Sequence, residues 1–453
     1  MREASPAGEF LAVAAAAPDH PAVVHDGRPI TYGELRAAAE AVAAGLGDRP
    51  GIVGVPATRT PETIAALLGV WLAGGAYCPL DPAFPEERLA AMRAVCDRVL
   101  GEPGEPVDRP VPAYVLFTSG STGAPKPVAT PVTAIAIVTA ALRDLFAITQ
   151  HDRVLQFASL NWDTCFEEIL PALSSGATLV LDADAHTGSF ARFLRVVERE
   201  HVTVLDLPTA FWQELVHHLT EDAAVLPHCV RLVITGGEAV RPARLADWLV
   251  LGTNARLLNT YGCTETTLIT HACELAEAYE KVPIGHALPH VVEVVEDGEL
   301  LVGGPALATG YLGLPEKTAE KFTERGLFRT GDRVSRRPDG MLVHEGRLDG
   351  EVKIRGIRVD PAEVEAHLVR HPAVLEAAVA GVRTANHTSL AAYVVVGADV
   401  EPAAILAELH TRVPGHLVPS RLTVVPRLVR TASGKVDRAG THEAGLVVME
   451  GKR

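Results

Sequence analysis

Residues 202–219, VTVLDLPTAFWQELVHHL, join a short β-branched run to a stretch whose apolar residues recur at helical spacing. The first part predicts a buried strand and the second an amphipathic helix. Four further strand-like runs lie between about residues 135 and 262, separated by other amphipathic stretches: RVLQFAS (153–159), ATLVLD (177–182), RLVITGG (231–237) and ARLLNTYG (255–262). Because strands that alternate with helices build βαβ units, we expect a largely parallel sheet with helices on both faces. Ligands of such sheets bind beyond the carboxyl ends of the strands, so the functional residues should lie in the loops that follow.

The pattern changes after about residue 283, where the predicted strands become shorter and rich in glycine, as in GELLVGG (298–304) and LFRTGDRV (327–334). A charged, turn-rich stretch, residues 346–360, leads into a last block that reads strand, helix, strand, strand, helix and tail. The predicted fold class is therefore α/β. A large N-terminal domain of parallel and mixed sheets layered with helices spans residues 1–348, and a small C-terminal α+β domain spans residues 349–453.

The charge balance of the 453 residues, 41 basic against 56 acidic, gives a net charge of −15, which argues against nucleic acid or an anionic membrane as partner. The N-terminus has no signal-peptide pattern, and the most apolar window, residues 63–80, reads as a core helix running into a strand. Six cysteines without CxxC or metal-type spacing favour a reducing compartment. We expect a soluble cytoplasmic protein.

The stretch TSGSTGAPK, residues 118–126, places hydroxyls and glycines directly after a buried run and before a lysine. It lacks the G-K-[ST] ending of a Walker loop, since prolines flank Lys126. Inward-turned backbone N–H groups, hydroxyl donors and a mobile ammonium would nevertheless form a polyphosphate clamp. By composition alone, the alternative is a flexible surface loop.

This stretch resembles the phosphate-loop motif of the adenylate-forming superfamily, and in particular of free-standing, nonribosomal peptide synthetase-type amino-acid adenylation domains. Further motifs resemble that family in its own order over nearly the whole chain. They are LAGGAYCPLDP (72–82), NWDTCFEEILPALSSGATL (161–179), TGGEAV (235–240), NTYGCTET (259–266), FRTGDR (328–333), GRLDGEVKIRG (346–356) and TASGKVDR (431–438). Seven motifs in order are a far more specific signal than any one of them.

The resemblance implies ATP and Mg²⁺ as cofactors and aminoacyl-AMP formation with release of pyrophosphate. It gives Lys435 the main catalytic role, Thr264 contact with the α-phosphate and Glu265 the metal. By the same resemblance, the β- and γ-phosphates are bound by Thr118, Ser119, Gly120, Ser121, Thr122, Gly123 and Lys126. The residues that the resemblance assigns to adenine, ribose and the rest of ATP are Gly237, Glu238, Ala239, Asn259, Tyr261, Asp332 and Arg347. Asp349 matches the family's hinge between the two domains. Taken singly, such residues could equally be turn caps, core aromatics or solvated lysines.

The segment NWDTCFEEI carries the information on the substrate. By resemblance, Asp163 pairs with the amino group of an amino acid. Glu167 lies four residues on, on the same helix face, where two carboxylates repel each other unless a cation sits beside them. The other positions that the resemblance assigns to the pocket are small or apolar: Thr164, Ala210, Ile234, Gly236, Thr260, Leu268 and Ile269. We therefore predict a diamino acid substrate: lysine, β-lysine or ornithine. The alternative is an internal ion pair of Glu167 with an arginine or lysine, which would leave a pocket for a neutral amino acid.

Partners follow from the same resemblance. After Arg438 only fifteen residues remain, without a carrier-protein motif. We therefore expect a free-standing enzyme of peptide natural-product or antibiotic biosynthesis that serves a separate carrier protein with a phosphopantetheine arm, and some relatives require a small activator protein. The competing interpretations are an acyl-CoA ligase and a non-catalytic ATP- or aminoacyl-binding module.

Overall fold

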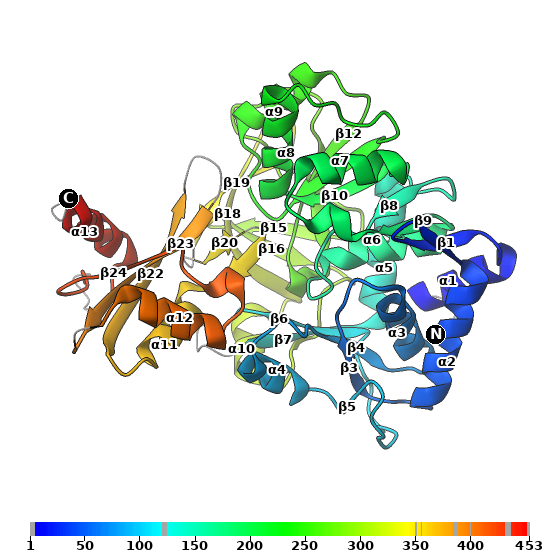
Figure 1. Ribbon diagram of the computed structural model, residues 1–453, viewed down its shortest axis with the longest axis horizontal. Coiled ribbons are helices and arrows are strands. Elements are labelled where there is room, and N and C mark those ends of the chain that lie inside the picture. Colours follow the sequence, from blue (N-terminus) through cyan, green and yellow to red (C-terminus); the bar gives the residue numbers. More distant parts are fainter. Residues whose placement is uncertain are drawn as a thin grey trace. The chain divides into compact units, whose positions relative to one another are not determined.

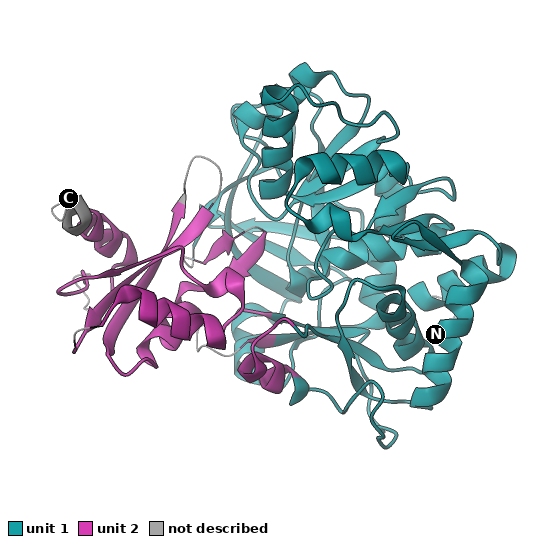
Figure 2. Ribbon diagram, in the orientation of Figure 1, with its two compact units in different colours: residues 1–82, 93–117, 127–348 teal, residues 83–92, 118–126, 349–453 magenta. Residues whose placement is uncertain are grey.

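The computed structural model describes residues 5–119, 125–348, 351–354, 356–383, 388–398, 400–430 and 436–450. The chain divides into two compact units, shown in different colours in Figure 2. Unit 1 comprises Met1–Pro82, Arg93–Phe117 and Pro127–Leu348. Unit 2 comprises Ala83–Met92, Thr118–Lys126 and Asp349–Arg453. Two short segments from the first half of the chain therefore belong to the same unit as its C-terminal part.

The largest sheet of unit 1 has nine strands in the order β14-β13-β12-β11-β10-β8-β9-β1-β2 (Figure 1). Its parallel part holds β1 (Pro21–His25), β8 (Arg153–Leu155), β9 (Thr178–Leu181), β10 (Val204–Pro208), β11 (Leu232–Gly236) and β12 (Arg256–Gly262). Its antiparallel edges are β2 (Arg28–Thr31), β13 (Ile269–Glu274) and β14 (His286–Ala287). The five strands predicted from the sequence lie in this sheet, and each pairs in parallel with its neighbours among the five.

Two hydrophobic cores cover the faces of this sheet, because successive strand residues point to opposite sides. On one face, Leu205 and Leu207 of β10 pack with side chains of α7 (Phe190–Arg199), α8 (Thr209–Glu221) and α9 (Pro242–Leu251). On the other face, Val204 and its neighbours pack with α5 (Val132–Phe146) and α6 (Thr164–Ser175). The short helix η1 (Ala183–His186) precedes α7. The predicted α/β class, with helices on both faces, is confirmed.

A six-stranded sheet follows the order β17-β7-β6-β4-β3-β5. Its strands are β3 (Ile52–Pro56), β4 (Ala76–Leu80), β5 (Arg98–Val99), β6 (Tyr114–Thr118), β7 (Lys126–Thr130) and β17 (Gly310–Tyr311). The helices nearby in sequence are α1 (Pro6–Ala16), α2 (Tyr32–Leu46) and α3 (Pro61–Leu72). The apolar window 63–80 is thus a buried helix followed by a buried strand, as predicted.

The glycine-punctuated region forms a four-stranded antiparallel sheet in the order β15-β16-β18-β19. Its strands are β15 (Val292–Glu296), β16 (Glu299–Gly303), β18 (Leu327–Arg336) and β19 (Leu342–Arg347). The helix α10 (Pro315–Lys321) lies between β17 and β18 in the chain, and the short helix η2 (Thr264–Thr266) follows β12.

Unit 2 is built on a three-stranded sheet of β22 (Val374–Arg383), β23 (Thr388–Val396) and β24 (Arg421–Val424). The first pair is antiparallel and the second is parallel. A hairpin of β20 (Val352–Ile354) and β21 (Ile357–Val359) precedes it. The helices are α4 (Glu86–Arg93), α11 (Pro361–Val369), α12 (Pro402–Arg412), η3 (Gly415–Leu417) and α13 (Arg438–Glu450).

The interpretation of the region after α12 as a plain tail was wrong, because it contains β24 and α13. The sequence of β24, RLTV, has only four residues and no clear alternation, and the strand exists because it pairs with β23 along its whole length.

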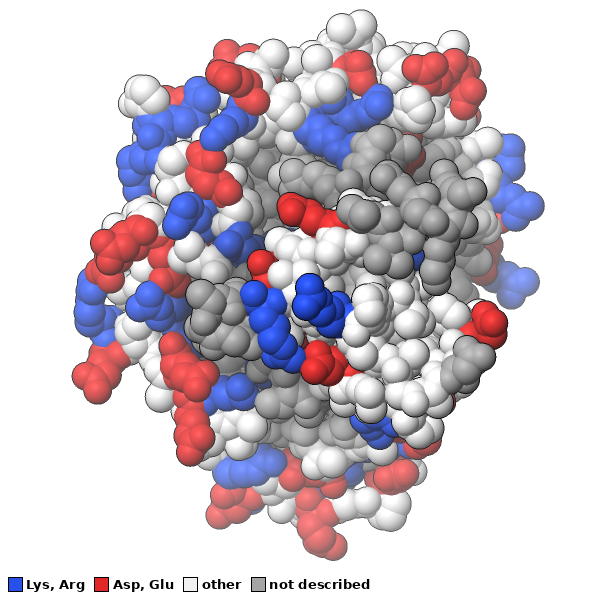
Figure 3. Space-filling view, turned by 90° about the vertical axis from the view of Figure 1, so that its left-hand side faces the viewer, with Lys and Arg blue, Asp and Glu red and all other residues white. Residues whose placement is uncertain are grey.

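Charged side chains of both signs are interspersed on the face of the molecule in Figure 3. No described helix combines the length and hydrophobicity that crossing a bilayer requires.

Candidate functional site

The carboxyl ends of three neighbouring parallel strands meet at one edge of the large sheet. Pro208 and Gly236, the last residues of β10 and β11, are in register with each other, and Gly236 is in register with Thr260 near the end of β12. A side chain on Gly236 would place its Cβ 2.5 Å from the Thr260 Oγ1, so this close approach requires glycine. Ala210, in the first turn of α8, directly follows β10. Three residues predicted to line the pocket therefore lie at the edge where ligands of parallel sheets bind.

Asp163 lies at the N-terminal end of α6, where it is half-buried beside two residues of a distant motif, Thr264 and Glu265. Its Oδ1 accepts a hydrogen bond from the Thr164 N–H at 3.1 Å. Burial raises the pKa of its carboxyl to about 6, and the charge of Glu265 acts in the same direction, whereas a hydrogen bond with Thr264 lowers it. Asp163, which is predicted to pair with the amino group, thus lies beside Thr264 and Glu265, which are predicted to contact the α-phosphate and the metal. About 100 residues separate them in the sequence.

Glu265 is held on the buried helix η2 by Tyr311, whose hydroxyl donates to Glu265 Oε1 at 2.7 Å. Thr267 and Leu268 follow with positive φ angles of 58° and 64°. Two consecutive non-glycine residues in the left-handed region are strained, and such strain is concentrated at functional sites. This turn leads into Ile269, so it places the predicted pocket residues Leu268 and Ile269 directly after the predicted metal ligand.

A second hydrogen-bonded group surrounds Asp332 on β18. The Tyr261 hydroxyl donates to Asp332 Oδ2 at 2.6 Å, and Arg347 Nη1 donates to Oδ1 at 3.1 Å. His344 Nε2 lies 3.0 Å from the same Oδ1. Three predicted ATP-site residues are thus in direct contact. Sequence reasoning missed His344, and strand alternation gave no signal for it, because residues three apart on β19 are expected on opposite faces.

The other predicted ATP-site residues of unit 1 make local contacts. The Asn259 side chain donates to the Pro283 carbonyl at 2.7 Å. The Thr209 hydroxyl lies 2.9 Å from the Gly236 carbonyl and 3.1 Å from that of Glu238. These contacts fix the ends of β11 and β12, and Gly237, Glu238 and Ala239 form the segment directly after β11.

The described part of the predicted phosphate loop lies in unit 2. Thr118 ends β6 and Lys126 begins β7. The Ser119 hydroxyl accepts a hydrogen bond from the Asp360 N–H at 3.1 Å. Burial raises the pKa of the Asp360 carboxyl, and Lys126 opposes that shift. Six residues with predicted roles, namely Gly120, Ser121, Thr122, Gly123, Asp349 and Lys435, lie outside the described residues.

Two adjacent acids in α6 have very different surroundings. Glu168 accepts hydrogen bonds from the N–H groups of Phe157 and Ala158, each at 2.9 Å, and from Gln156 Nε2 at 3.0 Å. Arg59 also attracts Glu168. Burial lowers the pKa of the Arg59 guanidinium, and the charge of Glu168 is the largest of the charge effects that oppose this shift. Glu168 is therefore an acid whose partners come from the protein.

Glu167 instead faces other acids. Burial raises the pKa of its carboxyl, and the largest charge effects come from Asp206 and Asp163. None of the ion pairs among the described residues involves Glu167, so the internal ion pair considered from the sequence does not form there. Sequence reasoning missed Asp206, a lone carboxylate within the apolar strand β10, and that isolation was a signal that could have revealed it.

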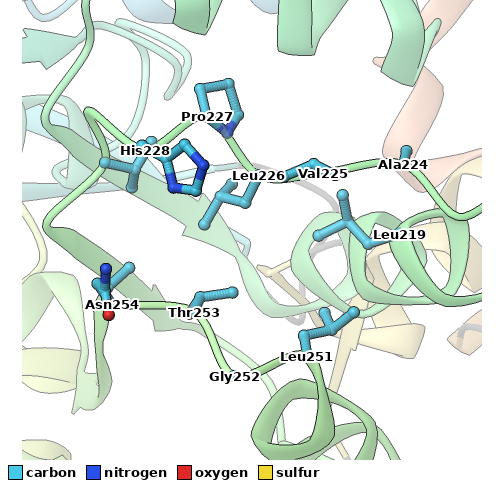
Figure 4. A pocket seen from close by; sticks show the side chains of 12 residues that line it. Leu219, Ala224, Val225, Leu226, Pro227, His228, Leu251, Gly252, Thr253 and Asn254 are labelled. Carbon is cyan, nitrogen blue, oxygen red and sulfur yellow. The ribbon is translucent and has the colours of Figure 1, made fainter.

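A pocket elsewhere in unit 1 contains none of these residues (Figure 4). The end of α8, the loop that follows it and the residues after α9 line it, among them Leu219, Leu226, His228 and Thr253. No acid, lysine or arginine is among its lining residues, and His228 is its one titratable side chain.

Comparisons with known proteins show the family to which the chain belongs. The model of the AMP-binding enzyme family matches residues 10–101 and 93–312, and that of the AMP-binding enzyme C-terminal domain matches residues 363–435. The isonitrile lipopeptide synthase of Streptomyces coeruleorubidus is 40% identical over 92% of this chain. The chain spans only 32% of the length of that relative.

Two solved structures share the fold over nearly the whole chain. An artificially fused adenylation–PCP di-domain, NpsA-ThdA from Klebsiella oxytoca, is 26% identical with a TM-score of 0.80, over 92% of this chain and 93% of that one. The amide bond synthetase McbA from Marinactinospora thermotolerans is 25% identical with a TM-score of 0.85, over 97% and 99%. The chain therefore belongs to the AMP-binding enzyme family. Its class is that of the ATP-dependent adenylating ligases, with a nonribosomal peptide synthetase-type adenylation domain.

Proposed function

We propose that this enzyme activates a diamino acid (lysine, β-lysine or ornithine) as its aminoacyl-AMP, with release of pyrophosphate. The observation that carries the proposal is the pairing of half-buried Asp163 with buried Glu167 one turn further along α6, without a protein cation on Glu167 among the described residues. Carboxylates buried without a counter-charge are unfavourable, and an ammonium group of the substrate removes that cost. A substrate with two ammonium groups supplies a cation to each.

Adenylation needs the substrate carboxylate and the ATP α-phosphate to be held in line and their charges to be neutralised. In this proposal Thr264 contacts the α-phosphate beside Asp163, so that the amino group of the substrate is anchored next to the reacting carboxylate. Lys435 bridges the carboxylate and the α-phosphate. The buried carboxylate of Glu265 fits Mg²⁺, since magnesium prefers hard oxygen ligands and Tyr311 fixes one of the two oxygens. The metal would neutralise phosphate charge.

The rest of the ATP site follows the same proposal. Tyr261, supported by its hydrogen bond to Asp332, would stack on adenine, with residues 237–239 on the other face. A carboxylate accepts well from hydroxyls, so Asp332 would hold the ribose beside Arg347. The phosphate loop, residues 118–126, would hold the β- and γ-phosphates.

We also propose two functional domains, residues 1–348 and 349–453, with a hinge at Asp349. The phosphopantetheine thiol of a carrier protein would then attack the aminoacyl carbonyl, so that a thioester forms, the bond to AMP breaks, and AMP and the thiol proton are released. The solved relative from Klebsiella, whose adenylation domain is fused to a PCP domain, supports this choice of acceptor. A small activator protein is a further partner to test.

The test is amino-acid-dependent ATP–pyrophosphate exchange over a panel of lysine, β-lysine, ornithine, diaminobutyrate, arginine, neutral amino acids, and fatty and aryl acids. We expect exchange confined to the diamino acids. Exchange with a neutral amino acid alone would keep adenylation and reject the diamino substrate. Exchange with fatty or aryl acids would favour an acyl-CoA ligase. No exchange over the whole panel, with an activator protein also tried, would reject the reaction.

A further inference from the structure

Cys78 and Cys96 come together on one face of the six-stranded sheet, above a glycine of β3. Cys78 lies in β4, in register with Gly54 of β3. Tyr77 and Val53, the residues before them, pack in one core, so strand alternation directs Cys78 and Gly54 to the opposite face of the sheet. A Cβ on Gly54 would lie 3.3 Å from Cys96 Sγ. The Cys96 thiol therefore occupies the space that this glycine leaves beside Cys78.

The two thiols interact directly and differ in exposure. Cys78 is fully buried, whereas Cys96 is half-buried. A hydrogen bond with Cys96 is the largest of the effects that raise the pKa of the Cys78 thiol, and burial adds to it. Cys229 and Cys273, by contrast, donate to backbone carbonyls at 3.6 and 3.5 Å. Two hydrogen-bonded thiols are close enough for one sulfur to attack the other once that other sulfur is oxidised.

The segment that carries Cys96 is anchored to β3 by the next residue. The Asp97 N–H donates to the Ile52 carbonyl at 2.8 Å, and the Ile52 N–H donates to Asp97 Oδ2 at 2.7 Å. Arg109 Nη2 donates to the same Oδ2 at 2.6 Å. Gly51, at a φ of 78°, leaves room for this carboxylate, because a Cβ at that position would lie 2.4 Å from Oδ2. The position of the Cys96 thiol is therefore fixed by the fold.

Cys78 lies on a strand that leads to the segment of the candidate site. Three residues further on, Asp81 Oδ2 accepts a hydrogen bond from Asn161 Nδ2 at 2.7 Å, and Asn161 lies two residues before Asp163. A disulfide holds its sulfurs about 2.05 Å apart, whereas non-bonded atoms stay at roughly 3.5–4 Å, so closing the bond moves one segment by about 1.5–2 Å. Because the second thiol is anchored, this movement falls on β4 and on Asp81.

We propose that Cys78 and Cys96 are a redox-modification site, at which a hydroperoxide converts the two thiols into a reversible disulfide that lowers the activity of the enzyme. This inference goes beyond the proposed function and does not depend on which amino acid is activated.

The half-buried thiol, Cys96, reacts first. Its sulfur takes the terminal oxygen of the hydroperoxide, the O–O bond breaks, and water or an alcohol leaves, so that Cys96 becomes a sulfenic acid. The Cys78 thiol then attacks the sulfenic sulfur: the S–S bond forms, the S–O bond breaks, and the Cys78 proton leaves with the hydroxyl as water. The two sulfurs lose two electrons in total, and the oxygens of the hydroperoxide take up both. A dithiol reductant reverses the reaction.

The experiment titrates the reduced wild type with hydrogen peroxide and follows two readouts: peptide mass spectrometry, and pyrophosphate exchange with the amino acid that the wild type activates best. We expect a cross-linked peptide containing Cys78 and Cys96, with the loss of two hydrogen atoms. As the cross-link forms, kcat/KM should fall at least about fivefold, because displacements of about 1 Å near reacting groups are costly to the rate. Dithiothreitol should remove the cross-link and restore the rate.

Cys96→Ser tests the site without altering the fully buried thiol. This variant should keep the basal exchange rate and lose both the cross-link and the response to peroxide. The matched control is Cys229→Ser, which removes another half-buried thiol and should respond as the wild type does. Cys263→Ser removes the half-buried thiol next to Thr264 in the sequence, and it should also respond as the wild type does.

Three results would overturn the inference: oxidation of Cys96 to a sulfinic or sulfonic acid while Cys78 remains a thiol, a response to peroxide that Cys96→Ser keeps, or a response that Cys263→Ser abolishes. A cross-link that leaves exchange unchanged would keep the modification site and overturn its effect on activity. A wild type that exchanges with no amino acid would overturn the proposed function, while the cross-linked peptide would still decide the modification site.

Discussion

At the scale of single residues, the adjacent acids Glu167 and Glu168 show how surroundings assign different roles to the same side chain. Both are buried in the first turns of α6. Glu168 receives its hydrogen bonds from the protein, whereas Glu167 faces Asp206 and Asp163. Glu168 therefore contributes to stability and Glu167 is available to a ligand.

Glu167→Gln should weaken diamino acids far more than neutral ones, since the amide removes one of the charges that attract an ammonium group. The measurement is KM in pyrophosphate exchange for lysine and for leucine, where we expect a loss of at least tenfold for lysine, equivalent to about 1.4 kcal/mol. An equal loss for both amino acids would return Glu167 to a structural role.

Lys435→Ala should abolish adenylate formation, with kcat falling by roughly 100-fold or more, because charge neutralisation at the α-phosphate is lost. ATP binding, measured by calorimetry, should change little. Lys353→Ala is a suitable control, since it removes another lysine of the C-terminal part of the chain that has no predicted role. Full exchange activity in Lys435→Ala would contradict the assignment of the catalytic lysine.

At the scale of elements, Glu168 joins α6 to the segment after β8. Its carboxylate accepts from two consecutive backbone N–H groups, those of Phe157 and Ala158, in a buried setting. Hydrogen bonds to a charged acceptor contribute about 1.5–3 kcal/mol each. The contact therefore fixes where α6 starts relative to the sheet, and with it the position of Asp163 and Glu167.

Glu168→Gln should lower the free energy of unfolding by about 2–4 kcal/mol, because an amide presents a donor where three donors already point. Chemical denaturation measures this, with Glu167→Gln as the neighbouring control that should change stability much less. Similar stability of the two variants would show that the hydrogen bonds of Glu168 are not decisive for the fold.

At the scale of the whole molecule, the acid pair links stability to pH. Burial raises the pKa values of Glu167 and Asp206 above those of an unfolded chain, that of Asp206 to about 7, and the charge of Asp206 raises the pKa of Glu167 further. Between the unfolded and the folded pKa values the folded state binds more protons, so its stability decreases as the pH rises through that window. Lysine should offset the loss, because its ammonium group neutralises charge on the ionised pair.

We therefore expect the Tm of the wild type to fall from about pH 5 upward relative to that of Asp206→Asn. The KM for lysine should fall over the same range, while the KM for leucine stays nearly constant. Thermal denaturation and exchange kinetics at several pH values check both. Parallel profiles of Tm for the two proteins would contradict an unpaired acid at Asp206.

Much of the architecture follows from the sequence. The alternation of β-branched runs with amphipathic stretches predicted the five parallel strands, and the ordered motifs predicted the family, because both signals are local and repeat many times. Short segments without a pattern of their own were less predictable. β24 is a strand only because β23 pairs with it, and a pairing between distant segments leaves no local trace.

The substrate pocket illustrates the same division. Sequence alone placed Asp163 and Glu167 on one helix face, because helical spacing relates residues four apart. Only the tertiary structure brought Asp206 to Glu167 and Glu265 to Asp163, and showed that Glu168 has partners from the protein while Glu167 has none among the described residues. The reason is physical: local propensity determines which face of its own element a residue occupies, whereas the packing of elements far apart in the chain determines what lies opposite that face.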